Sequence, residues 1–381
     1  MTRAPHEGFS LRRLRALCIK ETKQILRDPS SLLIAVVLPV VLLFIFGYGI
    51  SLDTNRLSLG IVLEDQGAEA QRFAAVAAGS PYIRPRFART RAELATPMAE
   101  GALRGLIVIP QDFGARLAAG DGSARIQVLT DGSEPNTANF VASYAQGLFE
   151  SWLHARADAR GVSADPPVSL EPRYWFNPST ESRNFLIPGS IAVVMTIIGA
   201  LLTSLVVARE WERGTMEALL ATPVRRGELL LSKALPYYGL GLIAMAVCVV
   251  IAVELMQVPL RGSIAMLFVA TSLFLGSALG LGLLLSTLTR NQFNAALAAL
   301  NAAFLPAVML SGLIFEISSM PAFVQAVTLI VPARYFVTVM QTLFQAGDIA
   351  AILLPNLLFL LVSALFWLGL TAWRTRMRLD G

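Results

Sequence analysis

Six long apolar runs divide the chain. They cover residues 32–52, 185–208, 234–256, 263–288, 293–315 and 351–373. Each run can cross about 30 Å of hydrocarbon at about 1.5 Å per helical residue. Glu254, near the end of the third run, is the only Lys, Arg, Asp or Glu within them. The pattern predicts an α-helical polytopic membrane protein with six transmembrane helices, the first in a segment spanning 31–52.

The basic residues of the short connections predict the orientation of these helices. Arginine and lysine resist translocation, whereas long domains cross the membrane largely regardless of charge. With six spans, the following basic residues fall on one side: Arg3, Arg12, Arg13, Arg15, Lys20, Lys23, Arg27, Arg209, Arg213, Arg225, Arg226, Lys233, Arg290, Arg374, Arg376 and Arg378. Both termini are therefore expected in the cytoplasm, and the formal charge of +5 is interpreted as a topology signal rather than as evidence for nucleic acid.

Residues 53–184 differ in character from the rest of the chain. They are charged, punctuated by Gly and Pro, and contain short apolar runs at 57–63, 105–110 and 125–130. These runs are typical of buried strands, and the segment around 138–155 has a helical pattern. We predict a large extracytoplasmic α/β domain here. The motif D-G-S-E-P-N-T at 131–137 is interpreted as a turn followed by a helix start.

Two further segments are expected at the membrane surface. Residues 9–27 predict a helix with Leu11, Leu14, Cys18 and Ile25 on one stripe, so that 1–30 would form a cytoplasmic amphipathic interface helix, although an ordinary charged flank is the alternative. Between the last two spans of segment 185–381, Pro321 and Pro332 bracket an apolar run too short to cross. This pattern predicts an outer re-entrant hairpin over 318–348, with Arg334 and Tyr335 at head-group depth.

The chain lacks the common signatures of an enzyme. A phosphate-binding P-loop needs Gly directly before Lys, but the only lysines follow Ile19, Thr22 and Ser232. Two distant histidines and two distant cysteines do not have the spacing of a metal site. We therefore expect no catalytic residues, no metal and no cofactor.

The charged stretch between the second and third runs, residues 209–226, is the candidate functional segment. Gly214 is expected to break the helix that leaves the membrane, Thr215 to cap a short new helix, and Thr222-Pro223 to end it. Met216, Leu219 and Leu220 would give this helix an apolar face. The face is available to a cytoplasmic partner, or it packs on the protein's own spans.

At these residues the sequence resembles the ABC-2 type exporter permeases, and among them the YbhS-like multidrug export permeases. The principal match is E-R-G-T-M-E-A-L-L-A-T-P-V-R-R-G-E-L-L-L-S-K at 212–233. Supporting matches are K-E-T-K-Q-I-L-R-D-P (20–29), F-G-Y-G (46–49), D-G-S-E-P-N-T-A-N-F (131–140), R-N-Q-F-N (290–294) and P-A-R-Y-F (332–336). The resemblance covers the whole chain.

The resemblance implies a multi-pass permease subunit of the bacterial cytoplasmic (inner) membrane that exports amphipathic compounds. Its implied partners are separate ABC ATPase subunits and a second permease chain, identical or paralogous, with membrane lipids and a periplasmic adaptor as further candidates. Segment 214–222 would be the coupling helix. The implied ATPase-coupling residues are Glu212, Arg213, Gly214, Thr215, Met216, Glu217, Leu219, Leu220 and Pro223.

The resemblance also implies that the second and fifth spans line the transport path, and the fifth run supplies the candidate residues. They are Asn301, Phe304, Pro306 and Met309, for which ordinary packing is an equal alternative. Gly276, Gly280 and Gly282 in the fourth run are interpreted as helix packing rather than dimerisation.

Two other functions remain as alternatives. An ion-coupled antiporter acting without an ATPase would need a carboxylate at mid-membrane, and Glu254 is poorly placed for that role. A non-transporting sensor or scaffold would use the α/β domain to bind a partner.

Overall fold

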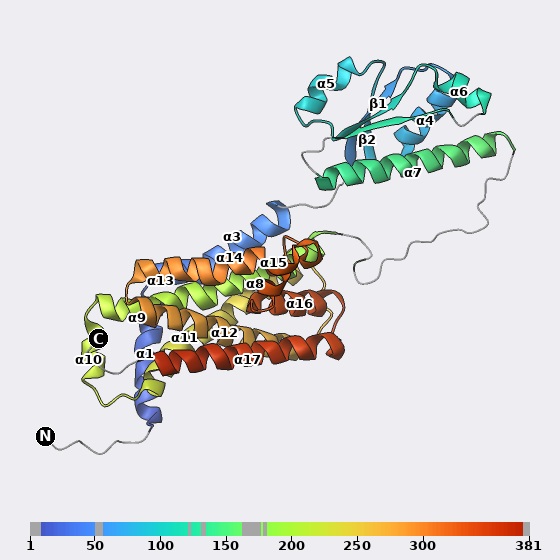
Figure 1. Cartoon of the computed structure of the whole chain (residues 1–381). Coiled ribbons are helices and arrows are strands. Elements are labelled where there is room, and N and C mark those ends of the chain that lie inside the picture. Colours follow the sequence, from blue (N-terminus) through green and yellow to red (C-terminus); the bar gives the residue numbers. More distant parts are fainter. Residues whose placement is uncertain are drawn as a thin grey trace. The chain divides into compact units, whose positions relative to one another are not determined.

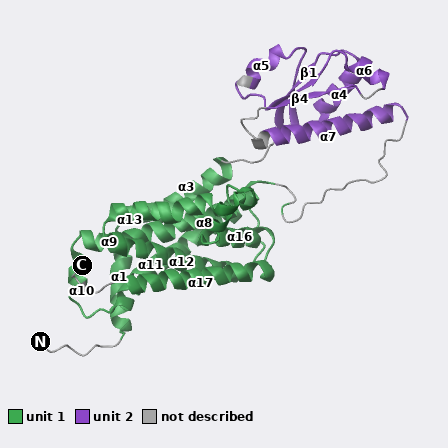
Figure 2. Ribbon diagram, in the orientation of Figure 1, with its two compact units in different colours: residues 1–51, 174–381 green, residues 52–173 purple. Residues whose placement is uncertain are grey.

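The chain forms two compact units. The computed structural model describes residues 9–49, 56–120, 123–130, 135–161, 177 and 181–375. Unit 1 comprises Met1–Ser51 and Tyr174–Gly381, and unit 2 comprises Leu52–Arg173 (Figure 2).

Unit 1 is a helical bundle, and the described residues hold six helices long and apolar enough to cross a membrane (Figure 1). We number them span 1 (Pro29–Gly49), span 2 (Arg183–Glu212), span 3 (Arg226–Leu255), span 4 (Ile264–Thr289), span 5 (Gln292–Met309) and span 6 (Ala350–Arg374). Their length, apolar character and number make the chain a polytopic membrane protein.

Several spans contain a π-helical turn between α-helical parts. Span 1 consists of α2 (Pro29–Leu32), η1 (Leu33–Val37), α3 (Leu38–Phe44) and η2 (Ile45–Gly49), and span 2 of α8 (Arg183–Thr196), η3 (Ile197–Leu201) and α9 (Leu202–Glu212). Span 3 consists of α11 (Arg226–Val250) and η4 (Ile251–Leu255), and span 5 of α13 (Gln292–Ala299), η5 (Leu300–Phe304) and α14 (Leu305–Met309). Span 4 is the single helix α12 (Ile264–Thr289), and span 6 is the single helix α17 (Ala350–Arg374).

The predicted span boundaries agree with the structure within four residues, except at the start of span 3, which begins at Arg226 instead of residue 234, and at the end of span 5. This helix was expected to reach Phe315 but ends at Met309. Leu310 already leaves the helical conformation, and Gly312 has a φ of +87°. A left-handed glycine of this kind cannot continue a right-handed helix.

Span 2 is the centre of the bundle, because every residue from Leu186 to Ala200 is buried. It packs directly against span 4 at small residues. A Cβ atom added to Gly282 would overlap Thr203 and the backbone of Ala200, and one added to Gly199 would overlap Ala278. Because glycine has no side chain, the backbones of spans 2 and 4 can approach each other closely.

Span 4 uses further small residues to pack against span 6. A Cβ atom added to Gly280 would lie 2.9 Å from the backbone nitrogen of Leu368, and Thr371 donates a hydrogen bond to the carbonyl of Gly280 at 2.9 Å. The glycines of span 4 serve packing within the chain, as the sequence analysis predicted.

Between spans 5 and 6, a broken helix pair follows a short 3₁₀ turn, η6 (Ile317–Ser319). Helices α15 (Ala322–Thr328) and α16 (Pro332–Gln345) are bent by 80° at their junction. Phe336 of α16 stacks on Phe274 of span 4 with ring centroids 4.2 Å apart, and Tyr335 stacks on Phe359 of span 6 at 3.7 Å. The pair is thus packed into the bundle through α16.

Unit 2 contains a four-stranded sheet covered by helices. The strands are β1 (Leu57–Leu63), β2 (Ile83–Ala88), β3 (Gly105–Ile109) and β4 (Gln127–Thr130), in the order β2-β1-β3-β4. Strand β1 is parallel to β2 and β3, and β4 is antiparallel to β3. The helices are α4 (Ala68–Gly79), α5 (Ala92–Ala99), α6 (Phe113–Ala119) and α7 (Pro135–Ala159).

The sequence predicted β1 and β3 but missed β2. Strand β2 contains Arg84, Pro85 and Arg86, which are atypical of a strand and are tolerated here because β2 is an edge strand. The strand expected at 125–130 is present as β4, but its expected burial is wrong, because β4 is the other edge and most of its residues are exposed. The predicted turn at 131–134 lies outside the described residues, and α7 begins at Pro135.

The close packing of spans 2 and 4 generates a stability prediction. Replacing Gly282 by Ala should lower the free energy of unfolding of the full chain by about 1–3 kcal/mol, because the added methyl group overlaps Thr203 and Ala200. Gly369→Ala in span 6 is the control, since a Cβ atom there meets nothing within 4 Å. Thermal unfolding in detergent measures the difference, and equal midpoints for the two variants would contradict this packing.

Candidate functional site

A cluster of charged side chains lies where the N-terminal helix α1 (Leu11–Leu26) meets spans 2 and 3. The ammonium of Lys233 lies 2.5 Å from a carboxylate oxygen of Glu21 and 2.6 Å from one of Glu210. Lys20 contacts the same Glu210 oxygen at 2.6 Å. We call Lys20, Glu21, Glu210 and Lys233 the ion cluster.

The ion cluster is largely shielded from solvent. The side chains of Glu21, Glu210 and Lys233 are only 3–4 % exposed, whereas that of Lys20 is 44 % exposed. Burial alone would lower the pKa of Lys20, but the hydrogen bond and charge of Glu210, together with Glu21, raise it overall. Two positive and two negative charges thus compensate each other in a place where an unpaired charge is expensive.

The short helix α10 (Thr215–Leu220) is attached to this cluster. It follows Gly214, whose φ of +68° reverses the chain after span 2. The hydroxyl of Thr215 donates to the carboxylate of Glu210, so the first residue of α10 is tied to the ion cluster. Thr215 was expected to cap α10. That expectation is wrong, because its side chain turns back to a buried charge instead.

The apolar side of α10 packs on its own bundle. Met216 is 3 % exposed and lies among Val207, Leu229 and Leu283 from spans 2, 3 and 4, and Leu219 packs against the same group. Of the two alternatives for this apolar face, packing on the protein's own spans is therefore correct for Met216, because the ends of three spans provide a closer apolar surface. Thr215, Glu217 and Ala218 are the residues of α10 that are exposed, among those whose side chains are described.

The remaining residues predicted around α10 fall into two groups. Glu212 accepts a hydrogen bond from the backbone nitrogen of Gln292 at 2.8 Å, which joins the end of span 2 to the start of span 5. Arg213, Gly214 and Pro223 are exposed. The side chain of Leu220 is outside the described part of the chain.

Two other ion pairs fix α1 along its length. Arg209 of span 2 binds Asp28 at 2.9 Å, and Arg13 binds Glu228 of span 3 at 3.0 Å. Partial burial would raise the pKa of Asp28, but hydrogen bonds from Ser31 and the charge of Arg209 lower it overall. On the predicted apolar stripe of α1, Ile25 is buried in the core and Leu14 and Cys18 are half-buried, whereas Leu11 is 75 % exposed. Ion pairs and the C-terminal part of the apolar stripe therefore both anchor α1.

The predicted path residues of span 5 do not share one environment. Asn301 and Met309 are exposed, and the Asn301 amide donates to the carbonyl of Leu297 at 2.7 Å. Phe304 packs against Leu186 and Val193 of span 2. Pro306 lines an apolar cavity of about 250 Å³, together with residues of spans 2, 4 and 6 and of α15 and α16. Glu254 is exposed at the end of span 3.

The ion cluster was not predicted from the sequence. Lys20 and Glu21 belong to the motif K-E-T-K (20–23) and Glu210 to R-E-W-E-R (209–213), whereas Lys233 lies alone in α11. Alternating charges at the membrane ends of apolar helices were the available signal. They did not reveal their partners, which are far away in the sequence.

The sequence of the chain is similar to those of known membrane proteins. Residues 29–373 match the family model described as ABC-2 family transporter protein. The chain is 56% identical to "Probable multidrug ABC transporter permease YbhS" of Escherichia coli (strain K12), covering 98% of this chain and 99% of that protein. It is 28% identical to "Probable multidrug ABC transporter permease YbhR" of the same organism, over 87% of this chain and 89% of the relative. Against "Linearmycin resistance permease protein LnrN" of Bacillus subtilis (strain 168), identity is 22% over 85% and 89%.

The ion cluster leads to a test with matched lysine variants. Lys233→Met should lower the free energy of unfolding by about 3–5 kcal/mol, because Glu21 and Glu210 then lose a shared buried cation. Lys23→Met, at an exposed lysine of α1, should change it by less than about 0.5 kcal/mol. Thermal unfolding of the full chain in detergent distinguishes these results. Equal losses in both variants would show that the cluster does not stabilise unit 1.

Proposed function

The chain belongs to the ABC-2 family of transporter proteins, and from this premise we propose that it is the membrane-spanning permease subunit of an ABC exporter. Separate ATPase subunits would dock on α10 and supply the energy. The chain itself would hydrolyse no ATP and hold no cofactor. Its cargo would be amphipathic, drug-like or lipid-like compounds, in keeping with the multidrug names of YbhS and YbhR.

The orientation follows from the positive charges of unit 1. Helix α1 and the connections at Arg213, Arg225–Arg226 and Arg290 lie at the same end of the bundle as the ion cluster, as does Arg374. Short basic connections remain on the cytoplasmic side. We therefore place both termini, α1 and α10 in the cytoplasm and unit 2 outside a bacterial inner membrane.

One observation carries the proposal most directly: α10 is attached both to polar groups and to the core. Thr215 binds Glu210, and Met216 is buried between spans 2, 3 and 4. A partner that pushes on α10 would therefore displace the ends of several spans together. This is the requirement for a permease without a nucleotide site of its own.

A partner could touch the exposed residues of α10 and its flanks. Thr215, Glu217 and Ala218 are exposed on α10, and residues 212–214 and 221–223 are exposed beside it. We propose that Glu217 and Ala218 contact the ATPase, while Met216 holds the helix in place. The coupling role of Glu212 would be indirect, through its hydrogen bond to the start of span 5.

A second permease chain would complete the transport path. Spans 1 and 5 expose apolar side chains, among them Val37, Val41, Leu297, Leu305 and Met309. Lipid or a second copy or paralogue would cover them. Asn301 would then lie on the shared path, since its polar side chain is exposed on the same span. Unit 2 would be available to a periplasmic adaptor.

Capture of the native complex tests the proposal. The tagged full chain is extracted from its host in mild detergent, and its partners are identified by mass spectrometry. The wild type should retain an ABC ATPase, and the variant Glu217→Lys/Ala218→Trp should reduce it by about tenfold or more, since interface energy concentrates in a few central contacts. Both residues are exposed, so the unfolding midpoint should stay unchanged.

Glu316→Lys is the matched control, because Glu316 is exposed but lies beyond the far end of span 5. It should leave ATPase capture intact. Because ATP is cytoplasmic, capture through α10 also tests the orientation. A wild type without any ATPase, or equal capture by the α10 variant and the wild type, would contradict the proposal.

A further inference from the structure

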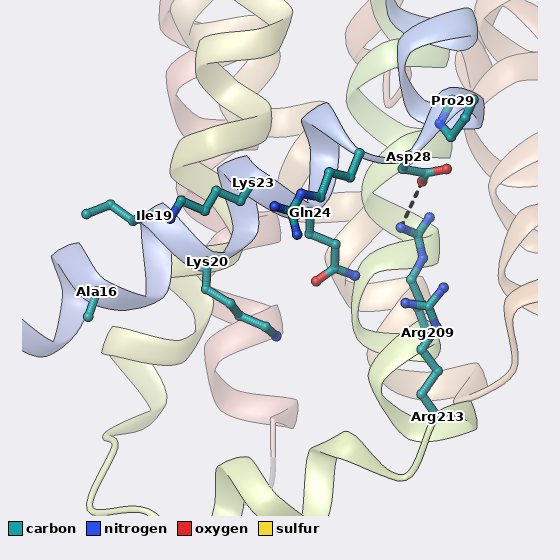
Figure 3. Close-up of a pocket in the computed structure, with 10 residues that line it drawn as sticks. Ala16, Ile19, Lys20, Lys23, Gln24, Asp28, Pro29, Arg209 and Arg213 are labelled. Carbon is teal, nitrogen blue, oxygen red and sulfur yellow. Dashed lines mark hydrogen bonds and ion pairs between the residues drawn. The ribbon is translucent and has the colours of Figure 1, made fainter.

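A basic pocket of about 670 Å³ lies between α1 and α9 at the point where α1 turns into span 1 (Figure 3). Its volume is in the range of small-ligand sites. The basic side chains that line it come from two places: Lys20, Lys23 and Arg27 from α1 and its C-terminal end, and Arg209 and Arg213 from the end of span 2 and the residue after it. Asp28 is the one acidic residue among its lining residues.

Three of these positive charges are not compensated. Asp28 is already bound to Arg209 at 2.9 Å, and Lys20 is bound to Glu210 at 2.6 Å. Lys23, Arg27 and Arg213 are exposed and form no ion pair with any carboxylate in the described part of the chain. Two separate helices thus direct unpaired cations toward one pocket, a geometry suited to an anion with several acceptor oxygens.

Exposed apolar residues lie in and beside the pocket, along α1 and at the start of span 1. Ile19 lines the pocket and is 45 % exposed. Leu26 and Leu33, which precede and follow the turn at Asp28-Pro29, are 64 % and 56 % exposed. Pro29 is the first residue of span 1 and also lines the pocket. Charged and apolar surfaces therefore meet at the boundary of the membrane-spanning segment.

We propose that this pocket binds the phosphate head group of an anionic phospholipid, with the acyl chains along the exposed apolar side of span 1. Basic pockets beside membrane helices on the cytoplasmic side are suited to such head groups. A free phosphate would use the cations but not Leu26 and Leu33. An acidic segment of an ATPase would not need a site bordered by the first turns of a span.

The bound lipid would reinforce contacts that the protein already makes. Its phosphate would bridge α1, through Lys23 and Arg27, to span 2, through Arg213. These elements are the ones joined by the Asp28–Arg209 pair and the ion cluster. Anionic lipid would therefore stabilise the end of unit 1. This inference concerns the permease alone and does not depend on its proposed role as an exporter.

Lipid binding to the purified full chain tests the site. Dioctanoyl-phosphatidylglycerol is titrated in detergent, with retention followed by native mass spectrometry and stability by thermal unfolding. Dioctanoyl-phosphatidylcholine, glycerol 3-phosphate and inorganic phosphate are titrated in parallel. Phosphatidylglycerol should raise the unfolding midpoint more than any of the three. The triple variant Lys23→Gln/Arg27→Gln/Arg213→Gln should weaken its binding by about tenfold or more.

A variant with the same change of charge separates this pocket from a general charge effect. Arg12→Gln/Arg15→Gln/Arg226→Gln removes three exposed arginines from α1 and the start of span 3, outside the pocket. It should bind phosphatidylglycerol like the wild type. Equal weakening in both variants, equal stabilisation by the inorganic or glycerol phosphate, or no preference over phosphatidylcholine would overturn the proposal. Loss of ATPase capture in the pocket variant with unchanged lipid binding would assign the pocket to a protein partner and also overturn it.

Discussion

The contact on which the structure of unit 1 depends is one ammonium shared by two carboxylates. Lys233 joins Glu21 to Glu210 through distances of 2.5 and 2.6 Å, and all three side chains are almost fully buried. Such charges are tolerable only together, since each alone would lose its hydration without gaining a partner. The cluster therefore specifies one arrangement of α1, span 2 and span 3.

Helix α10 and the ends of spans 2, 3 and 4 are connected through or beside this cluster, so that a displacement of one element would be transmitted to the others. Thr215 links α10 to Glu210, and Met216 seats the same helix between spans 2, 3 and 4. Farther from the cluster, Gly199 of span 2 and Gly282 of span 4 allow the backbones of these two helices to come into contact. Closely packed helices do not deform gradually. A shift at α10 would thus reach the bundle core through a polar connection at its end and small residues in its middle.

The features of this structure that depend on local sequence patterns could be predicted. Apolar length located the spans, and β1 and β3 followed from their short apolar runs. The resemblance to ABC-2 permeases also depended on local motifs. The ion cluster could not be predicted, because Glu21 and Lys233 meet only through the packing of α1 on span 3. The burial of Met216 was one of two alternatives left open for a related reason: the apolar face of a two-turn helix does not show which surface will cover it. Strand β2 was hidden by Pro85 between two arginines.

Hydrogen exchange of the full chain in detergent tests most directly whether the ion cluster unites these elements. In the variant Lys233→Met, amide exchange should accelerate in α1, in α9–α10 and at the start of α11 together, while spans 4 and 6 keep their protection, because local opening follows cooperative units. Accelerated exchange confined to the first turns of α11, with α1 and α10 unchanged, would contradict the account.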